Sequence, residues 1–410
     1  MLAPRAAVFR IVLALLGVVP GVVIAVAHLE VVPFLGMAVF GLAIWCAATL
    51  LGWAAETAEM DISGSLAVAL LAIVAILPEY AVDVLLAFKA GEQPEYEALA
   101  SANMNGATRL LIGFALPLTV LVGLTAHRRR LKREGSPAAR PAFLDAVPIP
   151  AAQYSTMFFL VIAAGLALVI PASRQVHAGL GGLLLLVFVV FLWHTSRGAV
   201  EEPDLVGVSA YMGSLSKNPR RWLVISMFLI AAATIAVGAE PFVEALKESG
   251  HILGIDERLL IQWLAPLASE APEFIIALTL ASRRKTWAAV GMILTSMVNQ
   301  WTALVGSLPM AYRLGGGSWS LPLDSIQVEE FLLTASVTAV AVALLLRLRV
   351  PAWGCWFMLA VFAAEFIIQD ERTRLLLAAV NVLAALVLLV RHRHSVPALF
   401  KEPFRRQDHS

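Results

Sequence analysis

The chain has little charge for its length. Only 14% of its 410 residues are Asp, Glu, Lys or Arg, against about 25% in soluble globular proteins. Hydrophobic residues make up 60%, and the mean hydropathy is +0.82. So few charges cannot cover the surfaces of two or three soluble domains, and they also exclude an intrinsically disordered chain. The composition predicts a polytopic integral membrane protein embedded in a lipid bilayer.

The chain has only two cysteines, and its net charge is close to zero. Cys46 and Cys355 lie inside apolar runs and read as small buried hydrophobic residues. The net charge of +1 gives no reason to expect nucleic acid as a partner. The eight histidines lack zinc-ligand spacing, and no nucleophile–base–acid arrangement stands out. We therefore expect neither an enzyme nor a cofactor.

Long apolar runs occupy most of the chain. A helix needs roughly 17–25 mostly apolar residues to cross about 30 Å of hydrocarbon. Because the runs are continuous and do not alternate, they predict helices and not a β-barrel. The first run has no clear cleavage site after it and is expected to be a retained span. The twelve expected spans are 7–27, 32–53, 62–88, 97–124, 154–171, 177–196, 221–245, 258–282, 287–311, 326–346, 352–369 and 374–390.

Lys and Arg residues gather on one side of these spans. With the N-terminus inside, the inner segments carry 22 of them and the outer segments carry seven. Positive residues are retained on the cytoplasmic side of membrane proteins. The bias predicts a plasma (inner) membrane protein with both termini in the cytoplasm.

The sequence repeats itself at an offset of 194 residues. Five spans, an odd number, separate the third span from the eighth, so the two copies cross the membrane in opposite directions. Chance resemblance between apolar segments does not readily align two polar motifs at one offset. The aligned residues are Pro78-Glu79 with Pro272-Glu273, Asn105 with Asn299, and Thr108 with Thr302.

The two repeated glutamates lie inside apolar runs. A charged residue deep in a span costs about 2.5–3.5 kcal/mol on insertion scales, so several together are hard to explain as accidents. The proline before each glutamate removes a backbone donor and frees a carbonyl one turn earlier. Inverted repeats with broken helices are typical of secondary transporters. Glu79 and Glu273 are therefore either cation ligands or buried acids neutralised by a proton or a partner, and we favour ligands.

This pattern resembles the α-repeats of the cation/calcium antiporter superfamily, which includes the sodium/calcium exchangers. The match covers roughly 48–117 and 233–310. The resemblance implies that Glu79 and Glu273 bind the ion and that Asn105 and Asn299 face them from the partner helices. The chain departs from the family pattern at one motif. Where the family has Gly-Thr-Ser, this chain has Val74-Ala75-Ile76 in one copy and Ala268-Ser269-Glu270 in the other. Thr108 and Thr302 replace a second family asparagine.

The expected fold is an all-α polytopic membrane protein of about 12 transmembrane helices. It consists of two inverted five-helix repeats with one extra helix at each end. The expected segments are an N-terminal helix (1–31), the first repeat (32–196, α-repeat 62–124), a cytoplasmic linker (197–220), the second repeat (221–369, α-repeat 258–311), and a C-terminal helix with a basic tail (370–410).

Further polar residues lie near the repeated glutamates. Asp83 and Glu270 share a helical face with Glu79 and Glu273 respectively, and each is either a site carboxylate or a salt-bridge partner. The ligand set that we expect also includes Ser269, and Thr108 and Thr302, for which interhelical packing is the alternative. Arg109 is either a contact for a substrate anion or a residue that compensates the acids, and we favour compensation, with Asp83 as its partner.

The expected function is secondary antiport of cations by alternating access, with calcium exchanged for protons or sodium. The extra carboxylates Asp83 and Glu270, and the missing hydroxyls at Ala75 and Ile76, favour protons somewhat over sodium. The alternatives are a sodium/proton exchanger of the same fold or, from another class, a membrane enzyme or a channel.

Overall fold

The computed structural model describes residues 3–61, 77–134, 145–197 and 205–404. The chain forms two compact units. The first unit contains Met1–Asn103, Phe188–Pro272 and Leu314–Gly316, and the second contains Met104–Val187, Glu273–Arg313 and Gly317–Ser410. Some helices contribute residues to both units: α5 (Tyr96–Arg109), α9 (Ala178–Thr195), α12 (Glu257–Ser282) and, with its last residue, α14 (Val305–Leu314).

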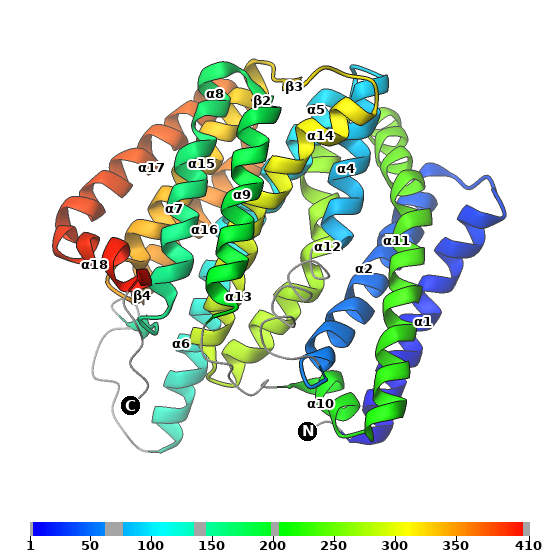
Figure 1. The fold of residues 1–410 in the computed structure, drawn as a ribbon, viewed down its shortest axis with the longest axis horizontal. Coiled ribbons are helices and arrows are strands. Elements are labelled where there is room, and N and C mark those ends of the chain that lie inside the picture. Colours follow the sequence, from blue (N-terminus) through cyan, green and yellow to red (C-terminus); the bar gives the residue numbers. More distant parts are fainter. Residues whose placement is uncertain (1–2, 62–76, 135–144, 198–204, 405–410) are drawn as a thin grey trace. The chain divides into compact units, whose positions relative to one another are not determined.

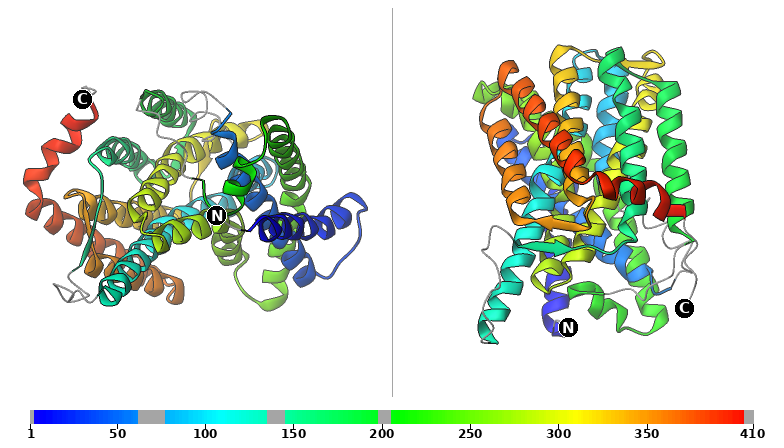
Figure 2. Two further views of the ribbon diagram at one scale, coloured as in Figure 1. Left: turned by 90° about the horizontal axis from the view of Figure 1, so that it is seen from below. Right: turned by 90° about the vertical axis from the view of Figure 1, so that its left-hand side faces the viewer.

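The first unit is built on helix α2 (Pro33–Ala58), which packs against α1 (Pro4–Val26) and α11 (Lys217–Leu253) (Figures 1 and 2). Small and branched side chains fill this contact, among them Ala47, Leu51 and Ala231. Helices α4 (Leu77–Glu92) and α10 (Gly207–Gly213) complete the unit. At 37 residues, α11 is about 55 Å long and extends well beyond a hydrocarbon layer of about 30 Å.

An ion pair joins the end of α2 to the start of α11. Arg220 donates from Nε and Nη2 to the two carboxylate oxygens of Asp61, at 2.8 and 3.0 Å. Two parallel hydrogen bonds are the strong geometry for an arginine–carboxylate pair. These bonds hold the pKa of Asp61 below its ordinary value. The pair therefore connects the two helices at neutral pH.

The second unit is built around α15 (Ser325–Leu345), which is buried around most of its circumference. Asp324 caps it, since its side chain accepts a hydrogen bond from the backbone of Gln327 at 2.8 Å. Helix α17 crosses over α15 (Figure 2). The other helices are α6 (Leu116–Arg133), α7 (Gln153–Ala167), α8 (Val169–Ser173), α13 (Thr286–Asn299), α14 (Val305–Leu314), α16 (Ala352–Ile367), α17 (Glu371–Arg391) and α18 (Val396–Lys401), with 3-10 turns at Arg393–Ser395 and Glu402–Phe404.

Two features of the second unit were not predicted. π-Helical segments at Leu110–Ala115 and Gln300–Leu304 follow the polar ends of α5 and α13. Short antiparallel ladders join the two halves of the sequence, because β1 (Ala146–Pro148) pairs with β4 (Arg349–Pro351) and β2 (Gln175–His177) pairs with β3 (Ser320–Pro322). Hydropathy cannot reveal a ladder of three residues.

The prediction of an all-α polytopic membrane protein is confirmed. Ten helices among the described residues are long and apolar enough to cross a membrane. The expected run 352–369 forms the 16-residue α16, and only the end of the expected run 62–88 is described. Several boundaries differ. Helix α6 continues to Arg133, the expected linker 197–220 contains α10 and the start of α11, and α11 continues to Leu253, beyond the expected end at 245.

Helices α9 and α14 approach each other at a pair of glycines in the second unit. A Cβ on Gly181 would lie 2.7 Å from the carbonyl oxygen of Gly306, and a Cβ on Gly306 would lie equally close to that of Gly181. We expect Gly181→Leu to destabilise the protein by about 1–3 kcal/mol or more, because the backbones would have to separate. Thermal unfolding of the purified protein measures this.

The adjacent Gly182 supplies the control. A Cβ on Gly182 meets no atom within 4 Å, so Gly182→Leu should leave the unfolding temperature nearly unchanged. Equal unfolding temperatures for the two variants would contradict the close glycine contact.

Candidate cation-binding site

Two buried glutamates face each other in the first unit. Glu79 lies in the first turn of α4, and Glu270 lies in the part of α12 that belongs to this unit. Glu79 is 5% exposed, Glu270 is fully buried, and a carboxylate oxygen of one lies within 4.8 Å of a carboxylate oxygen of the other. Two like charges this close inside a membrane protein repel each other, and a bound cation or a proton relieves the repulsion. Their oxygens are hard ligands of the kind that calcium prefers.

Asp83 follows Glu79 by one turn of α4 and is fully buried. Asn103, on α5 of the same unit, lies beside the Asp83 carboxyl group. The two carboxylate oxygens of Asp83 accept no hydrogen bond from a described residue. Sequence reasoning selected Asn105 from α5 and missed Asn103. The two asparagines are two residues apart and therefore lie on different faces of the helix. A search along the face of Asn105 could not have found Asn103.

The second unit holds Glu273, one turn after Glu270 on α12. The hydroxyl of Ser296, on α13, donates a hydrogen bond to its Oε2 at 2.7 Å. Asn299 follows Ser296 by three residues, and its buried amide oxygen accepts no hydrogen bond from any described residue. A carboxylate, a hydroxyl and an amide oxygen therefore belong to this part of the site. Ser296 was not predicted, although its i, i+3 spacing to Asn299 could have indicated it.

The equivalent asparagine of the first repeat is bound differently. The amide oxygen of Asn105 accepts a hydrogen bond from the hydroxyl of Thr334, on α15, at 2.8 Å. One asparagine oxygen is thus held by a neighbour, while the other is not held by any described residue. The two repeats are equivalent in sequence at this position but not in hydrogen bonding.

The predicted hydroxyl ligands donate to carbonyls of their own helices, and Thr108 also lies 3.5 Å from Oε1 of Gln300. Thr108 donates to the carbonyl of Met104 at 3.0 Å, and Thr302 donates to that of Val298 at 2.6 Å. Ser269 donates to the carbonyl of Pro266 at 3.2 Å. Their hydrogens are therefore occupied, while their oxygen lone pairs can still accept or ligate. Val74, Ala75 and Ile76 lie outside the described residues.

Arg109 lies beside an acid that sequence reasoning did not select. Its Nη1 is 3.8 Å from Oε2 of Glu365, on α16, and both side chains are 2% exposed. Its Nε donates to the backbone carbonyl of Asn105 at 3.3 Å. A second acid, Glu330 on α15, is fully buried in the same unit. Both glutamates lie inside predicted spans, and ionisable residues there are functional or structural candidates by default.

A polar cluster fixes α4 to α11 in the first unit. Lys89, near the end of α4, lies 2.7 Å from Glu240 and 2.8 Å from Glu244. The hydroxyl of Tyr96 donates to Glu244 at 2.6 Å, and Lys247 lies 3.9 Å from the centre of the Tyr96 ring. The cluster holds the helix that carries Glu79 against the 37-residue α11.

The chain is similar to known ion exchangers in sequence and in fold. The family described as "Sodium/calcium exchanger protein" matches residues 32–197 and 223–369. The crystal structure of the H⁺/Ca²⁺ exchanger CAX is 32% identical, covers 98% of both chains, and superposes with a TM-score of 0.89.

More distant structures share the fold. The Ca²⁺/H⁺ antiporter YfkE is 16% identical over 88% of this chain and 98% of its own, with a TM-score of 0.62. The sodium-calcium exchanger NCX_Mj is 15% identical over 82% and 99%, with a TM-score of 0.53. The uncharacterized membrane protein MJ0091 of Methanocaldococcus jannaschii is 24% identical over 149 residues, and this match spans 44% of its length.

Proposed function

The chain belongs to the sodium/calcium exchanger protein family, and from this premise we propose that it exchanges calcium for protons across the membrane. It is a secondary cation antiporter embedded in the bilayer. Inorganic cations are its substrates, and carboxylates are its principal ligands. The observation that carries the proposal is the buried pair of Glu79 and Glu270 within 4.8 Å.

The pair suits a divalent ion. Calcium takes six to eight oxygen ligands in a flexible geometry, whereas magnesium requires a stricter octahedron and keeps several waters. The proposed ligand set contains the repeated glutamate of each unit, together with acids, hydroxyls and amides of the same unit. It comprises Glu79, Asp83, Asn105, Thr108, Ser269, Glu270, Glu273, Asn299 and Thr302.

Protons can discharge the same carboxylates. When calcium leaves, the mutual repulsion of Glu79 and Glu270 is relieved by protonation. Calcium and protons therefore compete for the same oxygens, and a proton gradient can drive calcium in the opposite direction. Sodium would need more neutral oxygens, and the chain has no hydroxyl at Ala75 and Ile76, where the family has Thr and Ser.

The orientation follows from the Lys and Arg bias of the sequence. We place the chain in the plasma (inner) membrane with both termini in the cytoplasm. The repeats are taken as 32–196 and 221–369, with opposite orientations and with Arg109 compensating the buried acids. Transport then proceeds by alternating access between the two sides.

Proteoliposomes test the coupling ion. With calcium on both sides and an imposed pH gradient, we expect calcium flux that persists without sodium and reverses when the gradient is reversed. A sodium gradient at constant pH should drive no flux above that of empty liposomes. Flux that requires sodium and ignores the pH gradient would contradict proton coupling, and proton-driven sodium flux without calcium flux would favour the sodium/proton alternative.

A further inference from the structure

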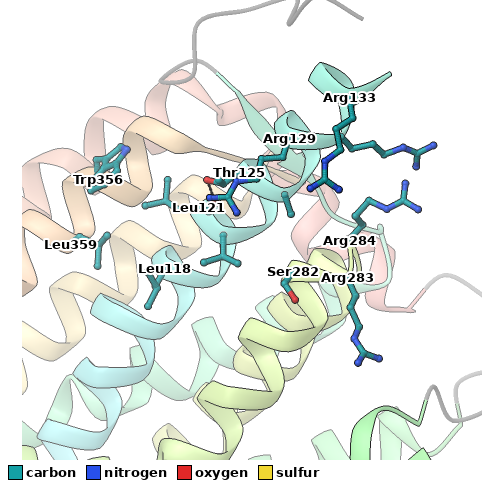
Figure 3. Close-up of a pocket in the computed structure, with 13 residues that line it drawn as sticks. Leu118, Leu121, Thr125, Arg129, Arg133, Ser282, Arg283, Arg284, Trp356 and Leu359 are labelled. Atoms are coloured by element: carbon teal, nitrogen blue, oxygen red, sulfur yellow. Dashed lines mark hydrogen bonds between the residues drawn. The ribbon is translucent and has the colours of Figure 1, made fainter. Parts of the chain in front are cut away.

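A crevice of about 850 Å³ opens on the second unit (Figure 3). Its walls come from α6, from the turn after α12, and from α16. Arg133 and Arg284 extend to one side, while Leu118, Leu359 and Trp356 lie toward the other (Figure 3). The crevice therefore has a basic end and an apolar end.

The basic end carries positive charge that the described residues do not neutralise. Arg130 pairs with Glu134 one turn away. Arg129, Arg133, Arg283 and Arg284 form no ion pair with any acid in the described part of the chain, and all four are exposed. Four uncompensated guanidinium groups around one opening attract a group with negative charge, and their planar forks suit phosphate oxygens.

The apolar end has the character of a membrane boundary. Trp356, near the start of α16, is 56% exposed and lines the crevice with Leu121 and Leu359. Tryptophan is enriched at the level of lipid headgroups, where an amphipathic ring is favourable. Aliphatic side chains below that level match acyl chains. Free phosphate would satisfy the arginines but would leave this apolar wall uncovered.

The two arginine-bearing segments are held together by close packing. A Cβ on Gly123, in α6, would lie 2.1 Å from the hydroxyl oxygen of Thr286, at the start of α13. The absence of a side chain at Gly123 lets α6 contact the turn that carries Arg283 and Arg284. Arg284 itself has a left-handed backbone (φ 71°), which closes the turn tightly after α12. The basic end is thus assembled by fixed backbone contacts.

We propose that this crevice binds an anionic phospholipid, with its phosphate between the arginines and its acyl chains along Leu118, Leu121 and Leu359. Basic pockets beside transmembrane helices bind anionic headgroups in this way. The proposal does not depend on which cations the protein exchanges, because none of these residues belongs to the proposed ligand set.

Native mass spectrometry of the full chain tests the proposal. The protein is released from detergent with added phosphatidylglycerol, phosphatidylcholine or inorganic phosphate. We expect phosphatidylglycerol to remain bound at one copy per chain and phosphatidylcholine to bind at least about tenfold more weakly. A diazirine-bearing phosphatidylglycerol should crosslink to residues 118–133 or 356–359.

The decisive variant replaces Arg129, Arg133, Arg283 and Arg284 with Gln. It should weaken retention of phosphatidylglycerol by about tenfold or more. A matched variant that replaces four exposed arginines elsewhere loses the same charge and should retain the lipid; its positions are Arg5, Arg10, Arg391 and Arg393. If the fourfold variant fails to fold, Arg129/Arg133 and Arg283/Arg284 are replaced as separate pairs.

Three results would overturn the proposal. Equal binding of the two lipids would remove the role of the arginines. Equal loss of bound phosphatidylglycerol in the decisive and matched variants would show that the effect depends only on the total positive charge of the protein. Displacement of the lipid by millimolar inorganic phosphate, without acyl crosslinks in the crevice, would assign the arginines to a free anion.

Discussion

Replacing either member of the buried glutamate pair, as Glu79→Gln or Glu270→Gln, should reduce calcium flux by more than about 100-fold. Loss of an outer-shell partner already costs 10–100-fold in metal affinity, and these carboxylates are proposed as direct ligands. Glutamine keeps the shape of the side chain but removes its charge, so proton exchange at that position is lost as well. Flux in proteoliposomes under an imposed pH gradient is the measurement.

The same two variants should lose transport without losing stability. The two carboxylates lie within 4.8 Å and repel each other, so a neutral glutamine should leave the calcium-free protein as stable as the wild type or more stable. Calcium should raise the unfolding temperature of the wild type but not of the variants, because ligands stabilise only what they bind.

Glu95→Gln is the matched control for this pair of variants. Its side chain is 62% exposed and pairs with Lys247 outside the proposed site. It should keep wild-type flux and the calcium-induced shift. Wild-type flux in Glu79→Gln or Glu270→Gln would remove that residue from the site.

The largest effect on stability is expected at Arg109. Arg109→Met leaves Glu365 as a buried charge without its arginine, which costs about 3–5 kcal/mol when one partner of a buried pair is removed. Arg109→Met combined with Glu365→Leu should recover most of the loss, because both charges are then absent. The unfolding temperature of the purified protein measures each variant.

A second double variant separates the two candidate partners of Arg109. Sequence reasoning paired it with Asp83, whereas the structure gives it Glu365 at 3.8 Å. We expect Arg109→Met with Asp83→Asn to remain as unstable as Arg109→Met alone. Recovery in this variant, and none with Glu365→Leu, would identify Asp83 as the partner. Arg372→Met, at an exposed position, controls for the loss of one arginine.

The helices could be predicted because the bilayer offers the backbone no hydrogen-bond partner, so each apolar run must form a helix. The glutamate of each repeat was predictable for a related reason. An ionisable side chain inside an apolar run is costly to insert into the bilayer, so it indicates a functional site. The same reasoning could have identified Glu330 and Glu365, which lack a repeated motif but lie inside predicted spans.

Other parts of the site depend on contacts between residues far apart in the sequence. The symmetry of the repeats makes Asn105 and Asn299 equivalent, yet Thr334 on α15 bonds only the first of them in the described structure. The bond between Ser296 and Glu273 joins two helices whose relative rotation hydropathy does not specify. The π-helical segments likewise change the rotation of residues beyond them without changing composition.

The two strand ladders have a consequence for synthesis of the protein. Strand β1 is made about 200 residues before its partner β4, and β2 about 145 residues before β3. At roughly 5–20 residues per second, β1 waits on the order of 10–40 s with unpaired backbone groups. The second unit therefore cannot complete its hydrogen bonding until the ribosome has passed Pro351, and truncation before that residue should leave a chain that insertion quality control removes.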